Sequence, residues 1–129
     1  FLLAMFLDLR PATPVTVVPG ITAMAACAAS QSSPLALGDD VLAVVPAAFE
    51  DDRLRQILTS LDAVVLMKVH RRLDALIDLL EELGLADQAV LTERTGLPGE
   101  RVYTDIRLAR GKQLHYFSTM VIRKKRVRV

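Results

Sequence analysis

The stretch Pro14–Ala29, PVTVVPGITAMAACAA, decides the fold class that we expect for this chain. Its valines predict a short strand over 15–18. A proline and a glycine end that strand, because proline has no N–H for a sheet and glycine permits a sharp reversal. Thr22 can cap the helix predicted over 22–30 by accepting a hydrogen bond from an orphan amide. The spacing fits an ordinary strand-to-helix turn; the alternative is that the exposed amides of this turn face a ligand.

Length and composition favour one domain with an aliphatic core. A chain of 129 residues buries roughly two-thirds of the surface that it exposes when unfolded. Apolar residues make up 52% of the chain and aromatic residues only 5%, so valine, leucine, isoleucine and alanine have to fill the interior.

The formal charge of +1 conceals an uneven distribution of basic residues. Five of the 16 lysines and arginines lie in the tail 123–128, RKKRVR, which leaves 11 in the rest of the chain against 15 acidic residues. The body of the chain is therefore acidic and a poor surface for nucleic acid. We expect the tail to be a solvated terminus; the alternatives are an electrostatic patch or a localisation signal.

A single cysteine and a short apolar start limit the compartment. Because Cys27 is the single cysteine of the sequence, a disulfide framework and a cysteine-based metal site are excluded. We expect Cys27 to be a packed core thiol, which fits a reducing, cytoplasmic compartment. The stretch 1–7, FLLAMFL, lacks a basic segment before it and meets Asp8 at once, so we expect neither a signal peptide nor a membrane span. Because the chain begins inside an apolar run, we also expect a fragment whose earlier residues are missing.

Apolar periodicity predicts an alternation of strands and helices. A continuous run such as AVVLMKV indicates a strand covered on both faces, whereas leucines at i, i+3, i+4 and i+7 indicate a helix. Strands are predicted at 15–18, 41–45, 63–69, 89–93, 101–108 and 114–122, and helices at 1–9, 22–30, 50–60 and 71–83. The crossovers imply a mainly parallel sheet, to which the last two strands add an antiparallel hairpin. The expected fold class is α/β, a three-layer-like mixed sheet of about five to six strands with helices packed on it.

Polar residues after the predicted strands indicate one cleft, without a complete catalytic group. Ligands bind at the carboxyl ends of the strands in open α/β sheets, and glycine or polar residues follow three of four such ends here. No nucleotide-binding glycine pattern is present. His70 and His115 have no partner at metal-ligand spacing, so we expect surface or strand histidines and no metal site. Met67 is expected in the core; alternatively, its polarisable thioether faces a flat ring at the cleft mouth.

Five stretches resemble the C-terminal half of the tetrapyrrole methylase family. They are VTVVPGITAMAACAA, LALGDDVLAVVPA, DAVVLMKVHRRLDAL, AVLTERTGLPGERV and HYFSTMVIRKK, in the family's order. VVPGIT is shared by the wider family, whereas GDDVLAVVPA, VVLMKV and ERTGLPGERV resemble most strongly the members that methylate C-20 of precorrin-2. The resemblance implies a C-terminal α/β domain over 14–125. It also implies a connector or last helix of a missing N-terminal domain at 1–13 and a basic tail at 126–129.

The resemblance also implies ligands and site residues. Members of the family bind S-adenosylmethionine between two domains, move its methyl group to a carbon of a reduced tetrapyrrole and are usually homodimers. Met67 matches the methionine that lies against the cofactor, and Thr95 and Gly96 match a loop with backbone contacts near the adenine. The matching loop beside the cleft comprises Pro19, Gly20, Ile21 and Thr22. Lys68 and Glu93 match characteristic residues of this enzyme type and have no assigned role.

The family's N-terminal glycine-rich loop is not in this chain, so we expect weak cofactor binding and no catalysis by the fragment alone. A sulfonium methyl group is already activated, and the intact enzyme would supply proximity, in-line orientation and exclusion of water. No catalytic nucleophile is predicted. The alternatives are a sibling methylase, acting on the cobalt-containing substrate or at another ring carbon, and a non-catalytic binding or dimerisation module. Nucleic acid and membranes are not expected partners.

Overall fold

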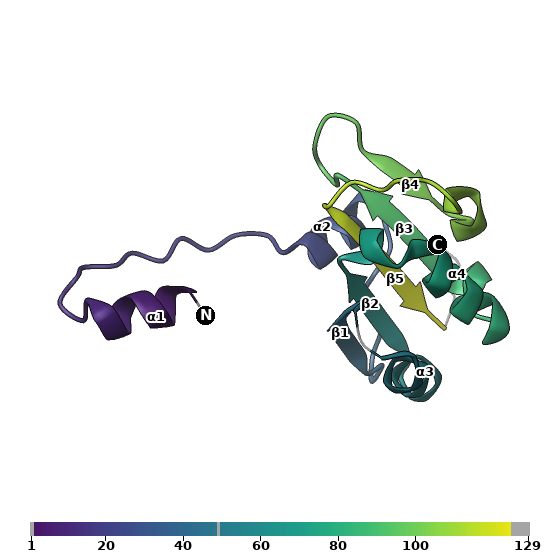
Figure 1. The fold of residues 1–129 in the computed structure, drawn as a ribbon, viewed down its shortest axis with the longest axis horizontal. Coiled ribbons are helices and arrows are strands. Elements are labelled where there is room, and N and C mark those ends of the chain that lie inside the picture. Colours follow the sequence, from purple (N-terminus) through teal and green to yellow (C-terminus); the bar gives the residue numbers. More distant parts are fainter. Residues whose placement is uncertain (1, 49, 125–129) are drawn as a thin grey trace.

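The computed structural model describes residues 2–48 and 50–124 (Figure 1). In this part of the chain the helices are α1 (Leu2–Leu9), α2 (Ala23–Ser30), α3 (Asp51–Ser60) and α4 (Leu73–Glu82). The strands are β1 (Leu42–Pro46), β2 (Ala63–Met67), β3 (Ala89–Glu93), β4 (Arg101–Tyr103) and β5 (Ser118–Arg123). Short 3₁₀ turns connect several of them, namely η1 (Val69–Arg71), η2 (Ala86–Gln88) and η3 (Ile106–Ala109).

The described strands form one mixed sheet in the order β1-β2-β5-β3-β4. β1 and β2 are parallel. β5 lies between β2 and β3 and runs antiparallel to both, so that Met120 is opposite Leu66 on one side and Leu91 on the other. β4 pairs with β3 at the far edge, again antiparallel. The predicted class, an α/β fold around a mixed sheet, is confirmed.

The predicted hairpin of the last two strands is wrong, and the sheet is less parallel than predicted. β4 pairs with β3, whereas β5 separates β3 from β2. No residue of β5 is exposed, while two of the three residues of β4 are. A strand that is covered on both faces belongs inside a sheet, and an exposed short strand belongs at an edge. Pairing the two strands because they are neighbours in sequence overlooks this difference in burial.

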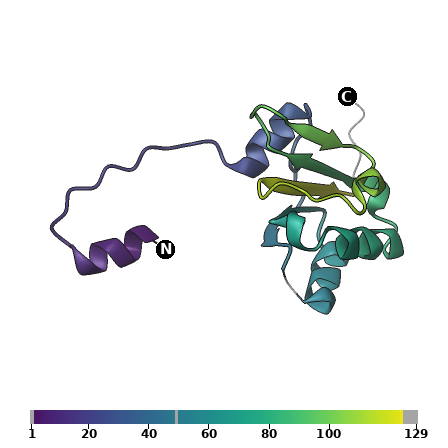
Figure 2. The same cartoon turned by 45° about the horizontal axis from the view of Figure 1, so that its top comes forward.

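Helices cover both faces of the sheet, which gives three layers (Figure 2). On one face, α3 and α4 bury leucines such as Leu58 and Leu80 in a single core with Leu66 and Met120 of the sheet. On the other face, α2 packs against the sheet, and the Gln31 side-chain amide that follows it donates a 2.7 Å hydrogen bond to Thr92 in β3. The small side chains of α2 let it lie close to the strands, because alanine adds little bulk beyond the helix backbone.

The strand predicted over 15–18 is wrong. Residues 14–22 are an extended segment outside the sheet, and the side chains of Val17 and Val18 are 73% and 81% exposed. A strand needs a neighbour that exchanges hydrogen bonds with it, and none of the described strands pairs with this segment. Figure 1 shows the segment leading away from the sheet to α1, in which no described residue is buried. The helix predicted at the start of the chain is confirmed in α1.

Two other predicted strands are too long. The strand predicted over 63–69 ends before Lys68, which adopts a left-handed φ of 61° and turns the chain into η1. The strand predicted over 101–108 ends at Tyr103. Asp105 then begins η3, because its carboxylate accepts a 3.0 Å hydrogen bond from a backbone N–H of that turn.

The last predicted strand begins later than expected, at Ser118, since the residues before it form a loop. The tail predicted at 126–129 lies outside the described residues. Within residues 2–48 and 50–124, none of the helices has the length and apolarity that a bilayer crossing needs.

Candidate functional site

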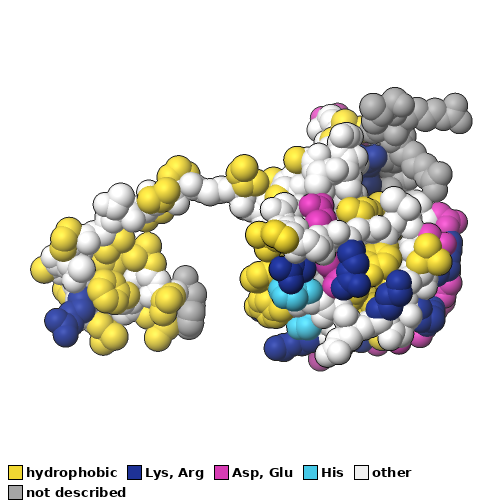
Figure 3. Space-filling model, turned by 90° about the horizontal axis from the view of Figure 1, so that it is seen from above, with side chains coloured by type: hydrophobic (Ala, Val, Ile, Leu, Met, Phe, Trp, Pro, Cys, Tyr) yellow, Lys and Arg dark blue, Asp and Glu magenta, His cyan; other side chains and the backbone are white. Residues whose placement is uncertain are grey.

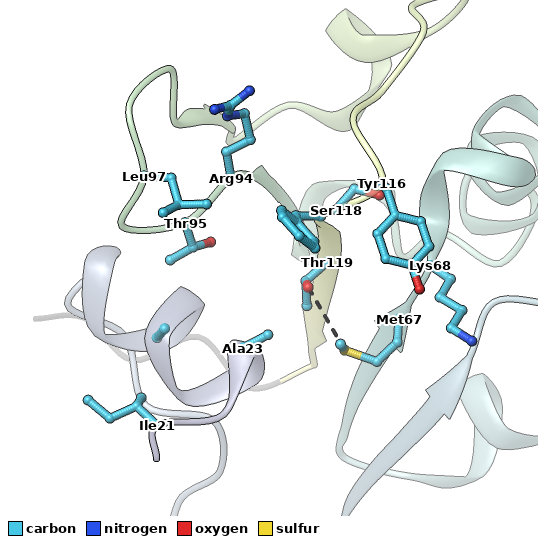
Figure 4. Close-up of a pocket in the computed structure, with 12 residues that line it drawn as sticks. Ile21, Ala23, Met67, Lys68, Arg94, Thr95, Leu97, Tyr116, Ser118 and Thr119 are labelled. Carbon is cyan, nitrogen blue, oxygen red and sulfur yellow. Dashed lines mark hydrogen bonds between the residues drawn. The ribbon is translucent and has the colours of Figure 1, made fainter. Parts of the chain in front are cut away.

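A cavity of about 360 Å³ opens at the edge of the sheet where β2 and β3 end (Figure 4). Four segments line it, namely the start of α2, the end of β2, the loop after β3 and the segment that leads into β5. The carboxyl ends of strands are the usual ligand-binding edge of an open α/β sheet. The cavity therefore lies at the edge where the sequence predicted a cleft.

The floor of the cavity joins β2 to β5. Met67 is opposite Thr119 in the strand register, and the Thr119 hydroxyl lies 3.9 Å from the methionine sulfur (Figure 4). Thr119 is 4% exposed, whereas Met67 is half-buried and lines the cavity. The cavity floor thus offers a polarisable thioether beside a hydroxyl.

The loop after β3 is held at both ends by hydrogen bonds. Arg94 has a left-handed φ of 54°, and its backbone N–H donates a 2.8 Å hydrogen bond to the Phe117 carbonyl. Gly96 has a φ of 71°, which a side chain would disfavour, and its N–H donates a 2.9 Å hydrogen bond to the Glu100 carboxylate. The side-chain Nε of Arg94 is buried without a hydrogen-bond partner in the described residues.

The single cysteine fastens this loop to α2. Cys27 is 1% exposed, and its Sγ lies 3.0 Å from Oγ1 of Thr95, a cavity-lining residue. The predicted core thiol is therefore buried, as expected, and it also contacts the edge of the candidate site.

Two exposed aromatic side chains form the opposite rim. Tyr116 and Phe117 are 54% and 57% exposed, and their rings meet edge to face at 5.6 Å between centroids. His70 contacts Tyr116 in the same way, at 5.2 Å. These aromatic residues were not predicted as site residues, since HYF was assigned to a strand. The one signal was a pair of aromatic residues in a chain that has few.

A buried carboxylate fixes the segment that carries this rim. Glu93 is 0% exposed, and its Oε1 accepts a 2.7 Å hydrogen bond from the backbone N–H of His115. Its Oε2 lies 3.0 Å from the Arg101 guanidinium and accepts a 3.3 Å hydrogen bond from the Tyr103 hydroxyl. Burial, reinforced by the negative charge of Glu93, raises the pKa of Tyr103. Glu93 therefore ties β3, β4 and the rim segment together.

The residues predicted to bind the cofactor or to form the cleft loop are only partly brought together. Those that line the cavity are Ile21, Met67 and Thr95. Gly96 is adjacent to Thr95 in the loop. Pro19 and Gly20 are exposed in the extended segment and do not line the cavity. Thr22 caps α2, as predicted, by accepting a 3.4 Å hydrogen bond from a backbone N–H of the first turn.

The two histidines lie beside the rim. His70 is half-buried in η1, and its backbone N–H donates a 3.1 Å hydrogen bond to Ser118. His115 accepts a hydrogen bond of 3.1 Å at Nδ1 from the backbone N–H of Phe117. Across residues 2–48 and 50–124, no cluster of three or more histidine, cysteine or acidic side chains could hold a metal ion.

With this fold and this cavity, the chain belongs to the tetrapyrrole methylase family. The model of that family, described as Tetrapyrrole (Corrin/Porphyrin) Methylases, matches residues 2–109. The match covers the elements from α1 to η3, and therefore every cavity-lining segment except the one that leads into β5.

Two curated relatives are similar over most of the chain. The chain is 38% identical over 109 residues to a precorrin-2 C(20)-methyltransferase from Sinorhizobium sp. It is 35% identical over 109 residues to a cobalt-precorrin-2 C(20)-methyltransferase from Salmonella typhimurium. Each match covers 84% of this chain but only 44% and 46% of the relatives, so the chain spans less than half the length of these relatives.

Solved structures share the fold at lower identity. The cobalt precorrin-4 methyltransferase CbiF aligns over 94% of this chain and 56% of its own, with a TM-score of 0.68 and 16% identity. A uroporphyrin-III C-methyl transferase from Thermus thermophilus, complexed with S-adenosyl homocysteine, aligns over 94% of this chain and 57% of its own, with a TM-score of 0.62 and 22% identity. These likenesses show the fold.

Proposed function

We propose that the chain is the C-terminal part of an S-adenosylmethionine-dependent methyltransferase that methylates C-20 of precorrin-2 in cobalamin biosynthesis. The observation that carries the proposal is the cavity at the carboxyl ends of β2 and β3, in a chain of which two curated relatives are named for methylation at C-20. In this reading residues 14–125 form the C-terminal domain, and residues 1–13 connect it to a preceding domain.

The residues of the cavity fit an adenosyl cofactor. Ligand pockets are lined mostly by apolar side chains with a few polar groups, and about 300–1,000 Å³ is their usual volume. This cavity, at the small end of that range, combines alanines of α2 and the Met67 thioether with the hydroxyls of Thr95 and Thr119. Across the cavity from the aromatic rim, Ile21 is 85% exposed and Leu97 is 45% exposed. Exposed apolar side chains around a cavity are typical of a binding surface. In the proposed whole protein, the preceding domain would cover these exposed side chains.

Each predicted site residue has a role in this proposal. The soft thioether of Met67 would lie against the cofactor, and Thr95 and Gly96 would supply backbone contacts near its adenine. The loop beside the tetrapyrrole comprises Pro19, Gly20, Ile21 and Thr22. When bound, the cofactor supplies an activated methyl group. The chain's residues then have to orient both ligands and exclude water, and none of them has to act as a nucleophile.

We also propose that the whole protein is a cytoplasmic homodimer in which the missing N-terminal domain completes the cleft. Support comes from the exposed apolar side chains of α1, among them Leu2 and Leu9 at 79% and 78%, which need a covering partner in water. Size-exclusion chromatography with light scattering would test the dimer, and a monomeric mass for the whole protein would contradict it.

One other substrate has a specific observation in its favour. The Salmonella typhimurium relative is named for the cobalt-containing precorrin-2, at nearly the same identity as the Sinorhizobium relative. Methylation at another ring carbon, and a non-catalytic binding or dimerisation module, are the remaining alternatives.

The test combines this chain with the part of a relative that it lacks. We expect the chain, mixed with a separately made N-terminal portion of the Sinorhizobium relative, to bind S-adenosylhomocysteine in calorimetry. The mixture should also transfer a labelled methyl group to precorrin-2, and mass spectrometry of the product should place it at C-20. Running cobalt-precorrin-2 in parallel separates the two substrates. Absence of cofactor binding in the mixture would contradict the proposed function.

A further inference from the structure

The basic side chains of the sheet domain divide into paired and unpaired groups. The arginines that form ion pairs with carboxylates are Arg55, Arg72, Arg101, Arg107 and Arg110. Lys68, Arg71 and Lys112, in contrast, form no ion pair with any carboxylate of residues 2–48 and 50–124. These unpaired cations lie together on one side of the molecule, as the next contacts show.

Three of the basic residues without an ion pair, Lys68, Arg71 and Lys112, lie near the aromatic rim. Lys68 lines the candidate cofactor cavity beside Tyr116 (Figure 4). Arg71 and Lys112 line a second, more open crevice of about 470 Å³, which also includes His70. Because the His70 ring contacts Tyr116 at 5.2 Å, the crevice and the cavity share one wall.

Three basic side chains, Arg71, Arg72 and Lys112, line the crevice with one acidic side chain, Asp74. Of its acidic neighbours, Asp74 accepts a 2.9 Å hydrogen bond from the Gly111 backbone N–H, and Asp51 forms an ion pair with Arg72. The Lys112 ammonium lies 5.0 Å from the centroid of the Tyr103 ring, which positions it without neutralising it. Figure 3 shows lysine and arginine side chains gathered around the two histidines, next to an apolar patch.

The chemistry of this surface fits a flat apolar ligand with an anionic edge. Tyr116 and Phe117 offer exposed aromatic faces, and Lys68 lines the same cavity beside them. A reduced tetrapyrrole carries acetate and propionate groups around its ring, all ionised at neutral pH. Lysine and arginine are the usual partners of such carboxylates.

We propose that Arg71 and Lys112 in the crevice, together with Lys68, bind the peripheral carboxylates of the tetrapyrrole while Tyr116 and Phe117 lie against its ring. This subsite rests on the proposed function, because it is the substrate side of the same cleft. It orients the macrocycle relative to the cavity beside Met67.

The experiment measures binding of two stable porphyrins to the whole chain. Uroporphyrin carries more peripheral carboxylates than coproporphyrin and should bind more tightly, with an affinity that falls as salt is added. Arg71→Gln and Lys112→Gln should each weaken uroporphyrin binding about fivefold and make its salt dependence shallower. The matched control is Arg55→Gln. Arg55 lies in α3, forms an ion pair with Glu82 and lines neither the cavity nor the crevice, so its substitution should leave porphyrin binding unchanged.

A second ligand separates this subsite from the cofactor site. In the two-part mixture, S-adenosylhomocysteine should bind the two variants as it binds the unsubstituted chain. Equal uroporphyrin affinity for the variants and the unsubstituted chain would overturn the subsite, and so would a failure of the unsubstituted chain to bind uroporphyrin. If S-adenosylhomocysteine still binds in either case, the proposed methyltransferase function stands without this subsite.

Discussion

The backbone N–H of His115 donates a 2.7 Å hydrogen bond to the carboxylate of Glu93, a side chain that is 0% exposed. This bond joins the end of β3 to the segment that carries the aromatic rim of the cavity. A buried carboxylate is stable only when its oxygens are paired, and this one also meets Arg101 and Tyr103. The position of the rim therefore depends on one acidic residue in the interior.

Replacing that carboxylate should destabilise the fold. In the unsubstituted chain, both oxygens of Glu93 accept hydrogen bonds from donors. In Glu93→Gln, an amide NH₂ takes the place of one oxygen and faces a donor without an acceptor, so we expect a loss of about 2 kcal/mol in the free energy of unfolding. Urea denaturation followed by circular dichroism measures it. The control is Glu50→Gln, at an exposed residue whose side chain makes no capping hydrogen bond. Equal midpoints for the two variants would contradict the structural role of Glu93.

Alkaline pH should weaken the fold through Tyr103. Burial, with the Glu93 charge as the next cause, raises the pKa of this phenol above its ordinary value of 10.0. The unfolded chain then loses the Tyr103 proton at a lower pH than the folded chain does. The stability that this group contributes is complete below pH 10 and is lost as pH rises through the folded-state pKa.

Urea denaturation at a series of pH values tests this linkage. Tyr103→Phe should have a smaller loss of stability above pH 10 than the unsubstituted chain, while Tyr116→Phe, at an exposed ring, should not differ from it. An unchanged alkaline slope in Tyr103→Phe would show that the linkage lies elsewhere.

The thioether on the cavity floor should contribute to cofactor affinity. Met67→Leu keeps the volume of the side chain, so we expect less than about 1.5 kcal/mol of lost stability. Loss of the sulfur contact should nevertheless weaken S-adenosylhomocysteine binding by about threefold to tenfold. Calorimetry on the two-part mixture described above measures the affinity. Met24→Leu, a half-buried methionine of α2 that does not line the cavity, is the matched control, and equal affinities would count against the role of Met67.

Two glycines with similar backbone conformations separate strain from function. Gly96 has a φ of 71° in the loop after β3, and Gly84 has a φ of 67° after α4, with open space beside both. Substitution by alanine should cost about 1 kcal/mol at either position, because a Cβ disfavours left-handed backbone. Only Gly96→Ala should also weaken S-adenosylhomocysteine binding. If both variants bind equally well, the loop backbone does not contact the cofactor.

Local patterns were sufficient to predict most elements, and they failed where pairing partners lie far apart in sequence. α3 and α4 followed from leucine spacing, and β3 was predicted over the same residues that the structure gives. The partners of β5 depend on which strand can fill the space between Leu66 and Leu91, and no local signal encodes that. Residues 15–18 failed for a related reason, since a strand-like composition does not supply a neighbouring strand.

The candidate site was predictable at its loops and not at its rim. Met67 and Thr95 lie directly at the carboxyl ends of strands, where a general rule for α/β sheets directs attention. Tyr116 and Phe117 precede a strand and enter the site only because β5 runs antiparallel between its neighbours, which brings its start to the same edge. The sequence alone did not reveal that geometry.

The central position of β5 has a consequence for synthesis on the ribosome. The strand that joins β2 to β3 is the last element of the described chain, so a nascent polypeptide that lacks Ser118–Arg123 holds the two halves of its sheet apart. Until then the inner edges of β2 and β3 present unpaired backbone groups, which are sites for aggregation. We expect a chain that stops before Ser118 to be insoluble, because the inner edges of β2 and β3 then stay unpaired.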